Sequence, residues 1–213
     1  MSDKEESQKI IGRLKEEYPE VDGTALNYSS PLELLVATIL SAQCTDEKVN
    51  EVTGTLFQKY KTVEDYATAD LEELQNIIKP TGFYRNKAKF IKRSTKKLME
   101  DFDSEVPMSI QDLTELYGVA RKTANIVLSN AFNINEGIAV DTHVMRLSQR
   151  LGFTDEDNRD KIEQDLMDLF PKGQWFDLTN LLIVHGRKIC TARNPKCREC
   201  VVNELCPSAF NFD

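Results

Sequence analysis

Four of the five cysteines in the 213-residue chain lie close together in its last quarter. Six, two and five residues separate successive thiols in the set Cys190, Cys197, Cys200 and Cys206. This spacing favours a metal site, because one compact loop can bring all four thiols to the metal. Cysteine chemistry alone does not separate zinc from an iron–sulfur cluster, since both accept four thiolates. We expect the fifth cysteine, Cys44, to be a small buried hydrophobe.

A lysine and an aspartate, Lys122 and Asp141, offer a second kind of chemistry. A neutral lysine amine attacks electrophilic carbon, and a carboxylate stabilises developing positive charge or moves a proton. Each residue also has an ordinary explanation, Lys122 as a solvated helix lysine and Asp141 as a helix N-cap. Local sequence alone favours the ordinary explanations.

The segment 113–128 must position Lys122, and it predicts a helix, a tight turn and a second helix. Gly118 supplies the point where the backbone bends freely. Apolar residues from Ala124 onward give the second helix a buried face. The N–H groups from Gly118 to Ala120 would point outward at the helix start and, with the helix dipole, form an anion site. Lys122 lies just inside this second helix, and Asp141 opens another.

Hydrophobic periodicity is helical along nearly the whole chain, and no convincing alternating strand is present, so the sequence predicts an all-α fold. Ser30-Pro31 and Asp70 predict helix starts, and Thr62 with Asp65 resembles a capping box. We expect further helices at 5–17, 46–60, about 86–101, 141–151, 158–169 and 175–189.

The net charge of −8 argues against a nucleic-acid partner, but the charges are segregated along the chain. The stretch 85–97 carries seven basic residues and no acid, and 187–198 carries five and no acid. Local basic patches neutralise phosphates, although 85–97 taken alone also fits a solvated helix face. No apolar run approaches the ~20 residues of a membrane helix. The polar, acidic start is unlike a secretory signal, so we expect a cytoplasmic monomer.

The hairpin and aspartate segments resemble the helix–hairpin–helix DNA glycosylases, and most closely the endonuclease III family. That family's pattern is roughly L-P-G-V-G-x-K-T-A and then V-D-T-H, and here 116–124 is LYGVARKTA and 140–143 is VDTH. Tyr117 replaces the usual Pro, and Ala120 replaces the second hairpin Gly. The resemblance extends to SAQCTD at 41–46, to KPTGFYRNKA at 79–88 and to the cysteine spacing.

The resemblance implies two helical domains flanking a DNA-binding cleft. A six-helix domain would cover 24–134, with the helix–hairpin–helix at about 112–128. Residues 1–23 and 135–213 would form the second domain, with an iron–sulfur loop at 190–206. The implied cofactor is a [4Fe–4S] cluster of structural role, with zinc as the alternative. The implied partner is double-stranded DNA with damaged bases or abasic sites, bound by a nucleoid-associated cytoplasmic protein.

The implied activity is that of a bifunctional DNA glycosylase and AP lyase of base excision repair acting on oxidised pyrimidines. Lys122 would attack C1′ of the sugar, kept neutral by desolvation and the positive helix end, and Asp141 would stabilise charge on the sugar. Gly118, Ala120 and Arg121 would hold a phosphate. Gln43 and the Gly82–Phe83 turn would fill the space that a flipped base leaves.

Several alternatives stay open at this point. Phe83 fits core packing as well as insertion into DNA. The same fold also serves monofunctional or mismatch-type glycosylases, which use activated water in place of the lysine. A non-catalytic DNA-binding module would keep the hairpin and the metal loop but would need neither Lys122 nor Asp141. A redox sensor built on the cluster is a weaker possibility, because Cys44 has no evident partner.

Overall fold

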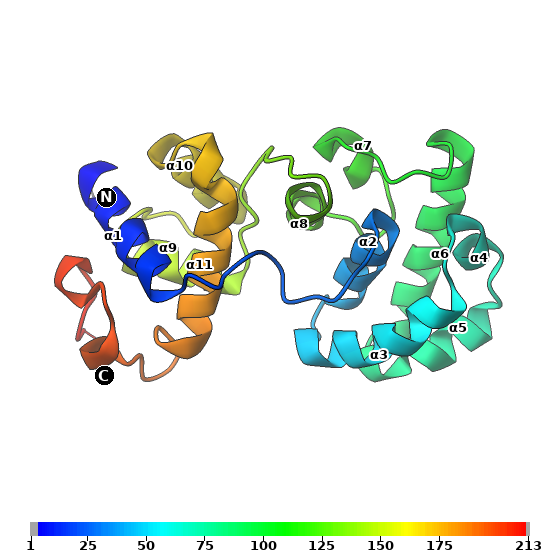
Figure 1. Ribbon diagram of the computed structural model, residues 1–213, viewed down its shortest axis with the longest axis horizontal. Coiled ribbons are helices and arrows are strands. Elements are labelled where there is room, and N and C mark those ends of the chain that lie inside the picture. The colour runs from blue at the N-terminus through cyan, green and yellow to red at the C-terminus, as the bar shows by residue number, and fades with distance from the viewer. Residues whose placement is uncertain (1–3, 212–213) are drawn as a thin grey trace. The chain divides into compact units, whose positions relative to one another are not determined.

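The computed structural model describes residues 4–211, and every regular element in that range is helical. The prediction of an all-α fold is therefore confirmed. The chain divides into two compact units (Figure 1). Unit 2 is Thr24–Glu136, and unit 1 combines the described residues of Met1–Gly23 with those of Gly137–Asp213. Among the described residues, no helix has both the length and the apolar character needed to cross a membrane.

Unit 2 is built from consecutive helices joined by short turns. They are α2 (Pro31–Leu40), α3 (Asp46–Lys59), α4 (Val63–Thr68), α5 (Leu71–Ile78), the 3₁₀ turn η1 (Lys79–Thr81), α6 (Tyr84–Asp101), α7 (Ile110–Thr114) and α8 (Arg121–Ala131). Seven of these are α-helices, and α4 and α7 are the shortest of them.

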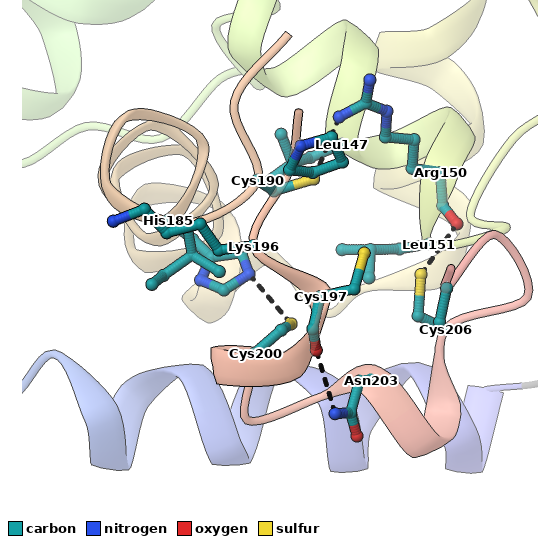
Figure 2. A pocket seen from close by; sticks show the side chains of 13 residues that line it. Leu147, Arg150, Leu151, His185, Cys190, Lys196, Cys197, Cys200, Asn203 and Cys206 are labelled. Carbon is teal, nitrogen blue, oxygen red and sulfur yellow. Dashed lines mark hydrogen bonds between the residues drawn. The ribbon is translucent and has the colours of Figure 1, made fainter. Parts of the chain in front are cut away.

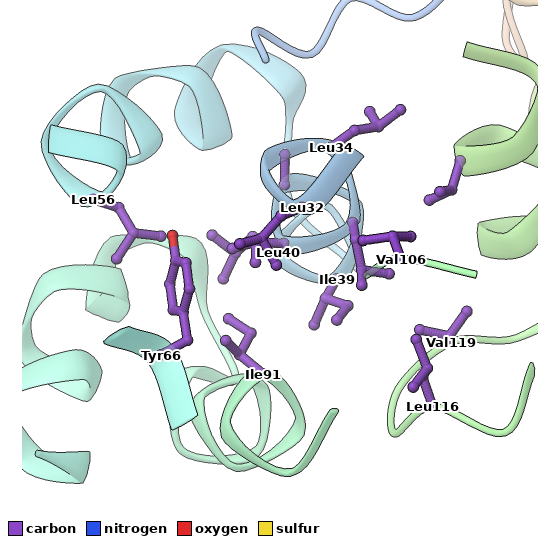
Figure 3. Close-up of a cluster of buried hydrophobic side chains, with 14 of the residues drawn as sticks. Leu32, Leu34, Ile39, Leu40, Leu56, Tyr66, Ile91, Val106, Leu116 and Val119 are labelled. Atoms are coloured by element: carbon purple, nitrogen blue, oxygen red, sulfur yellow. The ribbon is translucent and has the colours of Figure 1, made fainter. Parts of the chain in front are cut away.

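Helix α2 lies in the middle of the unit 2 core. Ser30 caps its first turn by accepting the Glu33 N–H, and Pro31 occupies the first helical position, as predicted. Apart from Pro31 and Glu33, every residue of α2 is buried. Figure 3 shows Leu32, Ile39 and Leu40 of this helix among buried side chains of the surrounding elements. A helix that is apolar on all sides is expected only where neighbours cover it completely.

Local capping fixes the starts of the helices that follow. Thr62 and Asp65 form the predicted capping box of α4, and Asp70 caps α5. Helix α6 begins at Tyr84, slightly before the predicted start at about 86. The reason is that the Phe83 carbonyl accepts the N–H groups of Asn86 and Lys87, at 3.0 and 3.1 Å, while Phe83 itself is left-handed.

Unit 1 combines the first helix of the chain with its last third. Its helices are α1 (Lys4–Glu17), α9 (Thr142–Arg150), α10 (Arg159–Leu169) and α11 (Trp175–Lys188), and the 3₁₀ turns η2 (Lys172–Gln174), η3 (Cys197–Glu199) and η4 (Asn203–Leu205) complete it. Ile10 and Leu14 of α1 have no exposed surface and join a core with Val144, Leu147 and Leu182. Helix α1 is thus an integral part of this unit.

Two substitutions within α1 should change the free energy of unfolding in opposite directions. Leu14→Ala removes a fully buried side chain and should lower the free energy of unfolding by roughly 2–5 kcal/mol. Gly12 is exposed in the same helix with open space around its missing Cβ, so Gly12→Ala should raise that free energy by up to about 1 kcal/mol. Urea denaturation of both variants checks the pair. Equal stabilities would contradict the placement of α1 in the core.

Candidate functional site

The hairpin between α7 and α8 turns at Gly118, which has φ +78°. Before it, the Leu116 N–H donates to the Leu113 carbonyl at 3.1 Å, and the Val119 N–H donates to the Leu116 carbonyl at 3.3 Å. Ala120 is the N-cap of α8 in an extended conformation, with φ −91°, that any residue adopts without strain. The replacement of a family glycine by Ala120 is therefore compatible with this turn. The N-cap Ala120 makes no side-chain cap bond to the first turn of α8, and the positive end of the helix favours an anion there.

Helix α6 contacts the hairpin through three of its side chains, Phe90, Arg93 and Ser94. The Ser94 hydroxyl donates to the Tyr117 carbonyl at 2.9 Å, and the Arg93 guanidinium lies 3.7 Å from the centre of the Tyr117 ring. A Cβ on Gly118 would lie only 2.8 Å from the Phe90 ring. Gly118 is thus required both by its positive φ and by this close approach. Tyr117, where the family has Pro, gains a cation–π contact in this position.

Lys122 is the second residue of α8, and it is exposed, as is the preceding Arg121. The desolvation that the sequence predicts for its amine would therefore require a bound partner that excludes water. The hairpin fixes the backbone at Lys122, because the Ala124 N–H donates to the Ala120 carbonyl at 3.0 Å as the first bond of α8.

Asp141 is the N-cap of α9, in unit 1. Its Oδ1 accepts the N–H groups of His143 and Val144, each at 2.8 Å, and its Oδ2 lies 3.1 Å from Nδ1 of His143. The Asp141 side chain is 15% exposed. The ordinary N-cap explanation is therefore correct, but capping uses only one carboxylate oxygen and holds the other in a fixed direction.

The two residues expected to enter DNA both sit on strained turns. Gln43 has φ +53° and Phe83 has φ +48°, a region that residues other than glycine seldom adopt. Both side chains are exposed, and Phe83 keeps 63% of its surface. The alternative that Phe83 packs in the core is thus wrong. Gly82, beside it, has φ +70° and ψ 159°, a combination restricted to glycine.

The four clustered cysteines surround one pocket in unit 1. None of them forms a disulfide. Figure 2 shows the side chains of Cys190, Cys197, Cys200 and Cys206 around the same space, whose lining also includes Leu147, Leu151 and Ile189. Burial raises the pKa of the Cys200 and Cys206 thiols. Thiolates in this setting therefore need nearby positive charge, which iron ions supply.

Polar groups around the pocket point at the cysteine sulfurs. The Arg150 guanidinium donates to Sγ of Cys190 at 3.3 Å. It also donates to the carbonyls of Thr191 and Ala192, at 2.8 and 3.1 Å. Sγ of Cys200 lies 3.4 Å from Nε2 of His185. Such contacts stabilise metal-bound thiolates and orient them.

His185 is held by a further contact on its other nitrogen. The Tyr18 hydroxyl lies 2.9 Å from Nδ1 of His185, which is 1% exposed. Burial lowers the pKa of His185 to about 4 and raises the pKa of Tyr18 to about 12. The phenol thus stays protonated and donates to Nδ1, and the neutral imidazole carries its proton on Nε2, facing Cys200. Sequence alone did not reveal this arrangement, because Tyr18 and His185 are far apart in the chain.

Four thiols around one pocket suit either zinc or an iron–sulfur cluster by their chemistry alone. A zinc site draws all its sulfurs to about 2.3 Å from one ion, whereas the thiolates of a [4Fe–4S] cluster bind separate irons.

Comparisons with known proteins agree with this arrangement. Residues 36–172 match the family model of the HhH-GPD superfamily base excision DNA repair protein, and 190–206 match that of the iron–sulfur binding domain of endonuclease III. Endonuclease III of Synechocystis sp. is 50% identical over 208 residues, 98% of this chain and 94% of that protein. The Bacillus subtilis enzyme is 51% identical over 182 residues, 85% of this chain and 83% of that protein. The chain belongs to the endonuclease III family.

A solved structure matches nearly the whole fold. The trapped endonuclease III–DNA covalent intermediate is 40% identical, with a TM-score of 0.94 and coverage of 99% of both chains. As an endonuclease III family member, the chain is a base excision repair protein of the DNA glycosylase and AP lyase class, with a [4Fe–4S] cluster held by its cysteine loop. Cys190, Cys197, Cys200 and Cys206 span the matched segment.

Gly118→Ala should weaken DNA binding by the hairpin. The added Cβ would collide with Phe90 and would also strain a left-handed residue, so the turn must shift. We expect at least about a tenfold loss of affinity for duplex DNA, together with about 1 kcal/mol or more of lost stability. Fluorescence anisotropy with labelled DNA measures the affinity. Gly54→Ala, on an exposed helix position with open space, is the control and should leave the affinity unchanged without lowering stability.

The cluster assignment predicts the metal content of the purified protein. Anaerobically prepared protein should contain iron and acid-labile sulfide in equal amounts and essentially no zinc. Cys200→Ser should lose most of both, because serine is a poorer ligand for iron in this loop. Elemental analysis and sulfide assay make the measurement. One zinc per chain without sulfide would overturn the assignment.

Proposed function

We propose that this endonuclease III family member removes oxidised pyrimidines from duplex DNA and then cleaves the strand on the 3′ side of the abasic site through a lysine Schiff base. Its place of action would be the nucleoid. The observation that carries the proposal is the position of Lys122 directly after an uncapped hairpin, in a chain that matches a trapped covalent intermediate with DNA. A DNA-binding module would need a hairpin but no amine beside it.

The hairpin would grip a phosphate of the damaged strand. Backbone N–H groups around Gly118, Ala120 and Arg121 form the positive end of α8, and the dipole of the helix favours an anion there. Backbone contacts to phosphate position the protein without reading the base sequence. That property suits a repair enzyme, because lesions arise in any sequence.

A base must leave the duplex before its glycosidic bond is accessible. Gln43 and Phe83 would enter the space that it vacates. Their exposed side chains stand on fixed turns of the same unit. The aromatic ring of Phe83 would stack between neighbouring bases, where an aliphatic side chain would only fill space.

Lys122 would be the nucleophile. Its neutral amine attacks C1′ as the bond from C1′ to the base breaks, and the departing base takes up a proton. Loss of the proton from nitrogen and opening of the sugar ring then give a Schiff base between Lys122 and C1′. The imine acidifies the proton at C2′, and its removal expels the 3′ phosphate. DNA bound over the hairpin would exclude water from the exposed amine and so favour its neutral form.

Asp141 would stabilise the positive charge that develops on the sugar as the base departs and would assist proton transfer. The N-cap bonds support this role because they fix the direction of the carboxylate while leaving Oδ2 to interact with His143 and the substrate. A carboxylate that is already oriented needs no rearrangement during the reaction.

The cluster would act on structure rather than on the reaction. When bound, it fixes the loop between Cys190 and Cys206 by coordination. Exposed basic side chains surround that loop, namely Arg187, Lys188, Arg193, Lys196 and Arg198. Held in place, they would give unit 1 a surface that attracts the DNA backbone.

Borohydride trapping tests the proposed nucleophile. The native protein on a duplex with one thymine glycol should give a covalent adduct, which Lys122→Gln abolishes because an amide nitrogen forms no imine. Lys161→Gln, at an exposed lysine of α10, is the matched control and should trap normally. Asp141→Asn should slow adduct formation by on the order of a hundredfold. Gel electrophoresis of the trapped species makes the measurement.

Other results would redirect the assignment. Base release by the native protein without an adduct would indicate a water-using, monofunctional glycosylase. Binding to DNA with neither base release nor adduct would indicate a non-catalytic module or a different lesion. An adduct that persists in Lys122→Gln would place the Schiff base on another amine.

A further inference from the structure

Lys87 is a buried lysine to which the proposed chemistry gives no role. It lies in the first turn of α6 and keeps only 3% of its surface. Its ammonium donates to the Leu40 carbonyl at 2.7 Å and to the Thr81 carbonyl at 2.8 Å. Burial lowers the pKa of this ammonium. Burying a charged lysine costs free energy unless hydrogen bonds compensate for the lost water, so this placement calls for an explanation.

Each carbonyl that Lys87 binds belongs to a segment leading into a proposed insertion residue. Leu40 is the last residue of α2, and the strained Gln43 follows it by one turn. Thr81 ends the 3₁₀ turn η1, and the strained Phe83 follows by two residues. One ammonium therefore joins two turns that are distant in sequence and that present the only two side chains expected to enter DNA.

The backbone of Lys87 reinforces the same turn. Its N–H donates to the Phe83 carbonyl at 3.1 Å, while its side chain holds the Thr81 carbonyl two residues earlier. Lys87 thus donates hydrogen bonds to the carbonyls of Thr81 and Phe83, which flank Gly82. The negative end of the α2 dipole, at Leu40, also favours a cation at this point.

We propose that Lys87 is a positioning residue for base flipping, whose buried ammonium locks the Gln43 and Phe83 turns into one preformed wedge. This inference rests on the proposed function of Gln43 and Phe83. Left-handed backbone at residues other than glycine persists only where the surroundings enforce it. Lys87 supplies that enforcement for both turns at once. A wedge fixed before contact loses little conformational entropy when it enters the duplex.

Lys87→Met tests the proposal, because it keeps the length of the side chain and removes the donors. A duplex with 2-aminopurine opposite the lesion reports base unstacking by its fluorescence, which should rise much less with the variant than with the native protein. Single-turnover release of a paired thymine glycol should slow by about tenfold or more. Trapping at an abasic site in single-stranded DNA, which needs no wedge, should change by less than about twofold.

A matched control separates positioning from general stability. Leu98→Ala removes a fully buried side chain from the other end of α6. It should lower the melting temperature but leave both the fluorescence rise and the rate ratio between duplex and single strand unchanged at temperatures well below unfolding. Lys87→Gln retains one polar donor group and should give results between those of the native protein and Lys87→Met. It also serves if Lys87→Met does not fold.

A double-mutant cycle distinguishes failure of this inference from failure of the proposed function. If Lys87 acts through the wedge, Lys87→Met should cause little further loss of flipping in a Gln43→Ala/Phe83→Ala background. If the loss of flipping caused by Lys87→Met multiplies with the loss caused by Gln43→Ala/Phe83→Ala, the inference is overturned. A reduction of flipping by Leu98→Ala as large as that by Lys87→Met would also overturn it. Native-like flipping and base release by Gln43→Ala/Phe83→Ala would instead refute the wedge itself. The lysine trapping test is independent of both results.

Discussion

Backbone carbonyls at buried helix ends need donors, and α6 provides them for the turns on which the proposed DNA contacts stand. The Lys87 ammonium satisfies carbonyls at the end of α2 and at η1, and the Ser94 hydroxyl satisfies the Tyr117 carbonyl in the hairpin. Phe90, between them on the same helix, packs where a Cβ on Gly118 would be. The proposed wedge and the proposed phosphate-binding hairpin are thus both held by contacts with the same helix, α6. A shift of α6 would move both together, which preserves their mutual geometry within unit 2.

In unit 1, helix α9 likewise links two parts of the proposed site, the carboxylate of Asp141 and the cysteine loop. Asp141 is the N-cap of α9, and Arg150 is its last residue, so one nine-residue helix connects the proposed catalytic carboxylate to a residue that contacts the cysteine loop. Helix α11 approaches α9 closely at Gly186, where a Cβ would lie 3.2 Å from the His143 ring. His185, the preceding residue, faces Cys200. Binding of the cluster would therefore stiffen the same helices that orient Asp141, and in this way it would influence the proposed catalytic carboxylate indirectly.

The sequence allowed much of this to be predicted, because the decisive signals were local. Helix periodicity, the capping box at Thr62 and the cap at Asp70 depend on neighbours in the chain, and the structure confirms each of them. The exposure of Phe83 and its left-handed backbone could not be predicted, because they depend on what α2 and α6 place around the turn. The same holds for Lys87, which in sequence looks like one basic residue among seven in 85–97. Only tertiary structure shows that Lys87 is buried while Arg85 and Lys89, the basic residues on either side of it, are exposed.

The uneven distribution of charge explains how an acidic chain can act on a polyanion. With a net charge of −8, the molecule as a whole is not attracted to DNA, and interactions between charges are screened beyond the Debye length of about 8 Å at physiological salt. Attraction must then come from basic side chains close to the phosphates, such as the seven in 85–97 and the five in 187–198. Acidic residues elsewhere, such as the seven in 155–168, would repel DNA that arrives in another orientation. The proposed contacts by α6, the hairpin and the cysteine loop would therefore act only at short range.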